Sequence, residues 1–415
     1  MKTLCLAGLG VLTLQAQQPA QTFTLPNGLR VVHLEDHERP LVRVLLHQDL
    51  QPGDTPAGHG GLAALALRLL DRSDAGDLKA TDYVRLLDGA GIQVDRTLRP
   101  GALEWRLVAR SRDQDRALGL LADRVLRTVL DPQLLEFQRL ACWQEELRLQ
   151  ASPRATLRQA LTPDPGLRPT LQGLAAISLE DLLAFKAKVF RPERAVLVLH
   201  GDLGLEQAKR LVMLSLGSWT APRFVAPDPH PLPAPAAETM PLAVASREPG
   251  RPAQTLAQAL IQPPAGLAPE VAALLGLLVP GDPAALPVQV GMEDSCLVAA
   301  LDAGPGESAP ALWSRLTAHL EALRQRGFTQ ADLDRAKAAW PARLSLESLD
   351  PERQMTTALD QALGRGVAPD QLQAVSLEAL NTGLRRWLDP AGYRGGVTGA
   401  PEPRPSDQQP PRNQP

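Results

Sequence analysis

The sequence predicts an α+β protein built from two halves, and three observations support that fold class. The chain has 415 residues, which exceeds the usual size of a single hydrophobic core. Short apolar or alternating segments typical of strands are interspersed with longer segments of helical periodicity. The order of these segments before a proline-rich stretch at residues 220–240 recurs after it. We therefore expect two domains of similar construction with a linker between them.

The first half is expected to open with a β-hairpin, because Asn27-Gly28 lies between two extended segments and favours a tight turn. Thr81 is expected to cap a helix, and Ser178 with Asp181 resembles a capping box at the start of a later one. Periodicity and turn residues together predict strands at 22–25, 29–34, 41–47, 92–98, 102–110 and 195–202, and helices that begin near residues 60, 81, 113, 131, 178 and 205.

The second half repeats this order with weaker signals. We predict strands at 255–261, 295–301 and 393–398, helices at 269–278, 309–326 and 329–343, and a pair of helices before residue 393. The expected domain bounds are 22–219 for the N-terminal domain, 220–240 for the linker and 241–400 for a shortened C-terminal domain. Residues 401–415 repeat Pro and Gln and are expected to be disordered.

The first 16 residues have the pattern of a secretory signal peptide. Met1-Lys2 supplies a basic start, residues 4–14 are apolar, and Ala16 precedes a polar stretch. The apolar run is too short for an ordinary transmembrane helix, so no transmembrane span is expected. The alternative is a disordered or buried N-terminal segment. We predict an exported protein, with the periplasm as the expected location.

Charge and cysteine content exclude several classes of function. The net charge is −3 and no basic cluster occurs, which argues against a nucleic-acid partner. Cys142 and Cys296 remain after signal cleavage, one in each expected half. Two buried free thiols are favoured over a disulfide between them. A structural zinc site is not expected because the chain has no CxxC pair.

Several segments, in this order and spacing, resemble the pitrilysin/insulinase family of zinc peptidases over most of residues 22–400. The resemblance implies two homologous α/β-sandwich halves, each a mixed, mostly antiparallel sheet covered by helices, which face each other across a chamber. The segments that carry it are LPNGLRV at 25–31, the glycine-entered helix from Gly61, LLDGAGI at 86–92, SLEDL at 178–182, VFRPERAVLVLHGD at 189–202 and GFTQADL at 327–333 with Ala336-Lys337.

The family's inverted zinc motif, His-x-x-Glu-His, is degenerate in this chain. The motif works because positions i, i+3 and i+4 share one helix face, where the two His bind zinc and the Glu activates water. The resemblance places these positions at Ala64, Leu67 and Arg68, which provide no ligand and no base. The distal carboxylate ligand would fall at Glu145, the candidate remnant of the site. One carboxylate cannot hold catalytic zinc, so we expect no metal, no cofactor and no catalytic residue.

The remaining candidate ligands have alternative explanations. Glu145 could pair with Arg68 across the former metal pocket, or it could be a solvated helix acid, and the sequence does not decide between them. His59 precedes the helix in a glycine-bounded loop and is interpreted as a loop residue, because no second ligand accompanies it. The other histidines of the first half form no ligand spacing either: His33, His37, His47 and His200.

The second half departs from the family as well. Its members carry a glycine-rich turn, an Arg-bearing helix and a Tyr that hold the substrate backbone. Here the helix at 269–278 is followed by a proline-broken segment, 279–287, with neither Arg nor Tyr. The sequence therefore predicts that the substrate-clamping element is missing.

Three functions follow, in decreasing order of preference. The first is a non-catalytic, exported family member that serves as partner or structural subunit of an active zinc peptidase, or that associates with itself. The second is a peptide-binding or chaperone-like module in which the strand near 92–98 accepts an unfolded peptide as an added strand. The third is a residual zinc metalloendopeptidase. It ranks lowest because no other catalytic constellation occurs in the sequence.

Overall fold

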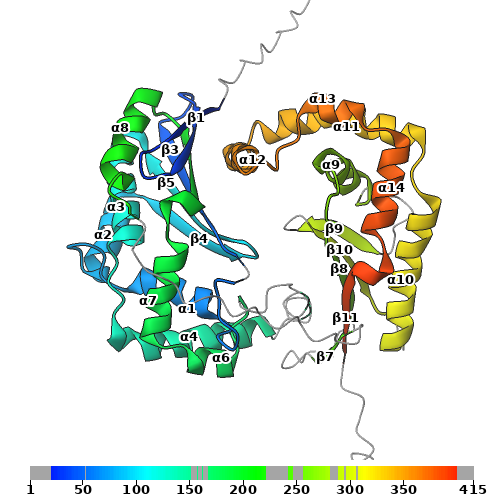
Figure 1. The fold of residues 1–415 in the computed structure, drawn as a ribbon, viewed down its shortest axis with the longest axis horizontal. Coiled ribbons are helices and arrows are strands. Elements are labelled where there is room, and N and C mark those ends of the chain that lie inside the picture. Colours follow the sequence, from blue (N-terminus) through cyan, green and yellow to red (C-terminus); the bar gives the residue numbers. More distant parts are fainter. Residues whose placement is uncertain are drawn as a thin grey trace, which may run out of the picture.

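The computed structural model contains two halves, each a β-sheet with helices packed against it (Figure 1). It describes residues 20–399 except 52, 151–156, 158–160, 162–166, 221–241, 246–255, 281–287, 294–295 and 305–306. The signal peptide expected at 1–16, the tail at 401–415 and the linker at 220–240, apart from its first residue, lie outside this part of the chain. Within the described residues, no helix combines the length and apolar composition needed to cross a bilayer.

The first half forms a six-stranded sheet in the order β1-β2-β6-β3-β5-β4, with β2 and β6 parallel and the other pairs antiparallel. The strands are β1 (Gln21–Thr24), β2 (Arg30–Glu35), β3 (Leu41–Asp49), β4 (Gln93–Arg99), β5 (Ala102–Arg110) and β6 (Ala195–Gly201). The helices of this half are α1 (Leu62–Arg72), α2 (Ala80–Ala90), α3 (Gln114–Leu126), α4 (Pro132–Gln150), α6 (Leu171–Ala176), α7 (Leu179–Val189) and α8 (Leu205–Leu216).

One face of this sheet forms the main core of the first half. Strand alternation directs Val42, Val44 and Leu46 of β3 to that face, together with Leu103, Trp105, Leu107 and Ala109 of β5, and all of these side chains are buried. Helices α1, α3 and α7 pack on them. The expected hairpin at Asn27-Gly28 is confirmed, since β1 and β2 pair across it. The capping box of Ser178 and Asp181 is confirmed at the start of α7.

The second half repeats the topology of the first. Its sheet has the order β7-β11-β8-β10-β9, in which β7 and β11 are parallel and the other pairs antiparallel, the pattern of β2-β6-β3-β5-β4. The prediction of two homologous halves with mixed, mostly antiparallel sheets is confirmed. The elements are β7 (Leu242–Ala245), β8 (Leu256–Ile261), α9 (Pro269–Leu278), β9 (Gln289–Glu293), β10 (Cys296–Asp302), α10 (Ala309–Arg326), α11 (Gln330–Glu347), α12 (Pro351–Ala362), α13 (Pro369–Ala374), α14 (Leu377–Trp387) and β11 (Tyr393–Gly399).

Some local predictions are wrong. Helix α2 begins at Ala80 with Lys79 as N-cap, so Thr81 lies inside it. The Asp74 carboxylate accepts from the Ala80 amide at 2.9 Å and replaces the expected cap. Three helices rather than two precede β11, because the six-residue α13 is too short to show periodicity. Helix α6 and the edge strands β7 and β9 are likewise short and were not predicted from the sequence.

The two halves pack reciprocally on each other's sheets. Helix α12 of the second half covers the face of the first sheet opposite the main core, where Met355 and Leu359 meet Leu45 and Val198. In return, Leu157 and Leu161 of the first half pack against Leu260, Cys296 and Val298 of the second sheet. Figure 1 shows α12 between the two halves, against the first sheet. Both sheets therefore carry buried apolar side chains on both faces, which explains the fully buried strand β6.

Gly61, the N-cap of α1, is expected to resist substitution. Its φ of +96° is left-handed, and an added Cβ would lie 2.8 Å from Cα of Pro169. We expect Gly61→Ala to lower the free energy of unfolding by about 2–4 kcal/mol, from backbone strain plus the clash. Gly58→Ala is the control, because Gly58 has a φ of +82° but no atom near its added Cβ. Urea unfolding measures the free energy of unfolding of both variants. Equal losses of stability in the two variants would contradict a contribution from the clash with Pro169.

Candidate functional site

Helix α1 presents the former zinc-motif positions on its least buried face. Leu62, Ala63, Leu65, Ala66, Leu69 and Leu70 are buried in the core. Ala64, Leu67 and Arg68 occupy the remaining, partly exposed face. The positions that resemble the inverted motif thus share one side of α1, as i, i+3 and i+4 spacing requires. The side chains on this face cannot ligate a metal.

The loop before α1 is held by a buried ion pair. The Arg194 guanidinium contacts both oxygens of the Asp54 carboxylate, at 3.2 and 2.5 Å, and also donates to the backbone carbonyl of Asp49 at 2.9 Å. Asp54 is buried and accepts from the Gln51 amide at 2.7 Å. His59 lies in this loop, with Nδ1 3.2 Å from the Ala57 carbonyl and Nε2 3.6 Å from the Asp181 carboxylate.

The C-terminal end of α1 is anchored by the buried Arg124 of α3. Its guanidinium donates to the backbone carbonyls of Leu70 and Ser73, and it lies 3.9 Å from the centroid of the Tyr83 ring. A cation at the end of a helix satisfies carbonyls that have no partner within the helix. The two ends of α1 are therefore both positioned by arginines from other elements.

Arg68 points from α1 toward α4. Its guanidinium lies within interaction range of the buried Cys142 thiol, and Glu146 and Glu145 are the next charged groups around that thiol. Burial raises the pKa of Cys142, while the positive charge of Arg68 acts in the opposite direction. Cys142 and Cys296 are both buried and neither is part of a disulfide, as the sequence predicted.

Glu146, rather than Glu145, is the buried acid beside the motif face. Glu146 is 1% exposed, and its carboxylate lies 3.7 Å from Nε of Arg168. Glu145 is 47% exposed and pairs with Arg148 one turn later on α4, at 3.4 Å. Among the described residues, no ion pair joins Glu145 to Arg68. This geometry favours the solvated-acid alternative for Glu145.

The histidines are distributed over separate sites. Within the part of the chain that the structure describes, no group of three or more His, Cys, Asp or Glu side chains could hold a metal ion. His33 contacts the Leu203 carbonyl at 2.7 Å, His37 lies between Glu35 and Asp202, and His200 contacts Gln354 of α12 at 2.9 Å.

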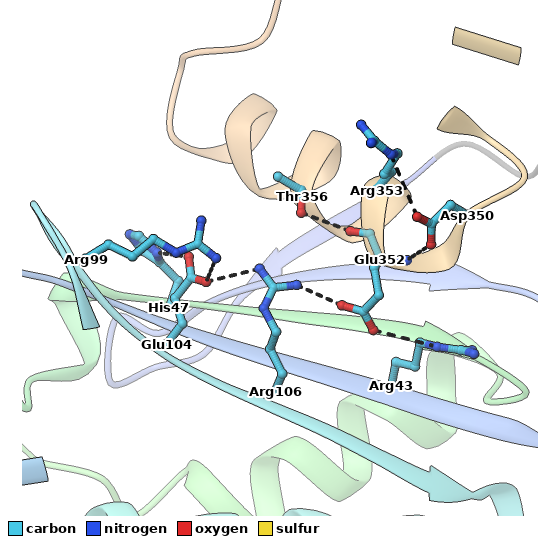
Figure 2. Close-up of polar contacts among 9 residues, drawn as sticks. All are labelled: Arg43, His47, Arg99, Glu104, Arg106, Asp350, Glu352, Arg353 and Thr356. Carbon is cyan, nitrogen blue, oxygen red and sulfur yellow. Dashed lines mark hydrogen bonds and ion pairs between the residues drawn. The ribbon is translucent and has the colours of Figure 1, made fainter. Parts of the chain in front are cut away.

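A chain of charges crosses the first sheet beneath α12, on the face opposite the main core (Figure 2). The Glu104 carboxylate accepts from Arg99 and Arg106, each at 3.0 Å, and lies 3.3 Å from Nδ1 of His47. Glu104 and His47 are both buried. Burial acts to raise the pKa of Glu104, but the hydrogen bond with His47 and the charges of Arg99 and Arg106 outweigh it and lower that pKa to about 2.

Glu352 connects this network to α12. Its carboxylate accepts from Arg106 at 2.7 Å and lies 3.8 Å from Nε of Arg43, so one acid of the second half bridges two strands of the first (Figure 2). At the other end of α12, Arg30 of β2 donates to the Ala362 carbonyl at 2.8 Å. Polar contacts therefore fix both ends of α12 on the sheet, and the apolar contacts of Met355 and Leu359 lie between them.

Sequence reasoning missed this interface. The alternation of β5 places Glu104 and Arg106 opposite its apolar face, which normally indicates solvent. The available signal was in strand β6, because its residues 195–199 are all apolar and such a run must be covered on both faces of the sheet. That signal does not identify the covering helix, which lies about 150 residues further along the chain in α12.

Comparison with known proteins agrees with this fold. A family model described as the M16 peptidase inactive domain matches residues 176–278, a stretch that includes α7, β6 and α8 of the first half and β8 and α9 of the second. No curated protein sequence matches the chain.

Three solved structures share the fold at low sequence identity. A protease from Helicobacter pylori has a TM-score of 0.77 and 16% identity, covering 93% of this chain and 100% of its own. The M16 peptidase inactive domain from Pseudomonas fluorescens has a TM-score of 0.70 and 15% identity, with coverages of 92% and 99%. The periplasmic protease PqqL from Escherichia coli has a TM-score of 0.70 and 15% identity, but only 47% of its chain is covered, against 93% of this one.

The matched domain spans the junction of the two halves, and the similar structures cover both. The sequence segments from 25–31 to 327–333 carry the same resemblance independently. The chain therefore has the fold of M16-like peptidases, and its residues 176–278 match the family model of the M16 peptidase inactive domain.

Proposed function

We propose that this protein is a non-catalytic member of its family that acts as a partner or structural subunit of an active zinc peptidase. The observation that carries the proposal is the motif face of α1, where Ala64, Leu67 and Arg68 replace two ligands and a base. A guanidinium at the second ligand position repels a zinc ion as well as failing to bind it. The buried Glu146 nearby is the only acid of α4 withdrawn from solvent, and one carboxylate does not make a catalytic zinc site.

Zinc analysis with a peptide-cleavage assay tests the missing chemistry. We expect the purified chain to contain no stoichiometric zinc and to show no chelator-sensitive cleavage. The triple variant Ala64→His, Leu67→Glu, Arg68→His should acquire zinc binding, because its three positions share one half-exposed helix face. Ala64→His alone is the control and should bind no zinc. Stoichiometric zinc and chelator-sensitive cleavage in the unmodified chain would overturn the proposal.

The partner role is tested by isolation under gentle conditions. Family members complete their chamber as pairs of such chains, and the fold resembles somewhat under half of the longer PqqL chain. We expect the tagged protein to co-purify with a homologous zinc peptidase, or with a second copy of itself, identified by mass spectrometry. Recovery as a lone monomer would count against a subunit role. The signal sequence at 1–16 and the likeness to a periplasmic protease support export to the periplasm.

A peptide-binding function is the second candidate. Strand β4 lies at the edge of the first sheet, where it pairs with β5 on one side, and its side chains are mostly exposed or half-buried. An exposed edge can accept an extended peptide through backbone hydrogen bonds without cleaving it. Binding of unfolded peptides by the isolated chain, abolished by a proline at Asp95, would favour this role over that of a pure structural subunit.

A further inference from the structure

A pocket lies on the helical side of the first half, and its described lining includes no residue of α1 or α12. It has a volume of about 450 Å³ and lies between the end of α3, helix α7 and residues 218–220. Both helices pack on the main-core face of the first sheet, whereas α12 covers the opposite face. The volume is within the range of small-molecule sites, roughly 300–1,000 Å³.

The walls of this pocket expose polar and apolar surface in about equal amounts. Trp219 is buried, and its indole N–H is already used in a hydrogen bond to the Phe190 carbonyl at 3.1 Å, so it adds no unsatisfied polar atom to the wall. Leu183 is 50% exposed and leaves apolar surface for a ligand to cover. The apolar lining residues are Val125, Leu126, Leu183, Ala187, Phe190 and Trp219.

Lys186 supplies a positive charge to this apolar surface. Its ammonium donates to the Thr128 carbonyl at 2.7 Å, which uses one of its three N–H groups. Burial lowers the pKa of Lys186 to about 8, because the charged form is poorly solvated there. Among the described lining residues, the other charged group is Arg127, which is ion-paired with Asp123, and no carboxylate lines the pocket.

We propose that this pocket binds a small anionic amphiphile, a monocarboxylate with an aliphatic body. The carboxylate accepts from the two remaining N–H groups of Lys186, and the aliphatic body covers the half-exposed Leu183 side chain. An anion is favoured because it compensates a desolvated ammonium that has no acidic partner in the pocket. The apolar body is favoured because Leu183 leaves carbon surface beside Lys186 and six of the ten lining residues are apolar. This site is independent of the proposed subunit role.

Calorimetric titration of the full chain with octanoate, octanol and octylamine tests the proposal. We expect octanoate to bind at least tenfold more tightly than octanol, which has the same body without the charge, and octylamine not to bind. Lys186→Met should weaken octanoate binding at least tenfold while retaining the aliphatic stem. Lys209→Met is the matched control, because Lys209 is an exposed cation of α8 paired with Glu206 at 2.7 Å. It should leave the affinity unchanged.

The dependence on pH gives a second measurement that needs no variant. Octanoate affinity should fall by up to about tenfold per pH unit above pH 8, as the Lys186 ammonium loses its proton, while Arg127 stays charged. The proposal is overturned by any of three results: no octanoate binding at millimolar concentration, equal affinity for octanoate and octanol, or equal affinity in the Lys186→Met and Lys209→Met variants.

Discussion

Replacing Leu359 by aspartate is expected to detach α12 from the first sheet and to lower the free energy of unfolding by about 3–5 kcal/mol. Leu359 is 4% exposed and packs among Val32, Leu45 and Val198 on the face of the sheet that the second half covers. A carboxylate at this position enters an aliphatic cluster, so it must either lose its hydration or force the interface open. Urea unfolding measures the loss, and small-angle X-ray scattering measures any increase in the radius of gyration.

The matched control for this variant is Thr357→Asp. Thr357 is exposed on the same helix, so the same charge enters α12 without entering the interface. We expect a change within about 0.5 kcal/mol and no change in dimensions. If Leu359→Asp behaved like Thr357→Asp, α12 would not hold the halves together.

Replacing Glu104 by glutamine is expected to remove an acid-sensitive part of the stability. The pKa of Glu104 is about 2 in the folded chain, against an ordinary value of 4.5. A carboxylate whose pKa is lower in the folded chain than in the unfolded chain stabilises the fold at pH values above its unfolded-state pKa. This stabilisation is lost as the pH falls toward its folded-state pKa. That contribution is about 3 kcal/mol at neutral pH and is lost between about pH 5 and pH 2. Because Glu104 is only 4% exposed, solvent screening reduces this contribution to stability only slightly.

Unfolding measured between pH 7 and pH 2 checks this expectation. The difference in stability between the unmodified chain and Glu104→Gln should be largest at neutral pH and should vanish near pH 2. Glu136→Gln is the control, because Glu136 pairs with Arg139 at 3.1 Å but is 79% exposed. It should change the stability by less than about 1 kcal/mol throughout. A pH-independent difference for Glu104→Gln would show that its ion pairs contribute no net stability.

Most of the local structure was predictable because its causes are local. Strands β5 and β6, the hairpin at Asn27-Gly28 and the capping box at Ser178 follow from alternation and turn chemistry within a few residues. One error occurred where a residue outside the segment fixes the boundary of an element. Helix α2 begins at Ala80 because the Asp74 side chain caps it. Elements of six residues or fewer, such as α6 and α13, carry too little periodicity to be recognised.

The sequence alone determined the family resemblance, the prediction of two halves and the alignment of Ala64, Leu67 and Arg68 with the zinc-motif positions, because these depend on residue identity and order. Only the tertiary structure decided which acid of α4 is buried. Neighbouring residues such as Glu145 and Glu146 differ by about 100° around a helix, and packing selects between them. The covering of the first sheet by α12, and the ion pairs of Glu352 with strands β3 and β5, also required the structure. They join segments about 150 residues or more apart, and no local pattern encodes such a distance.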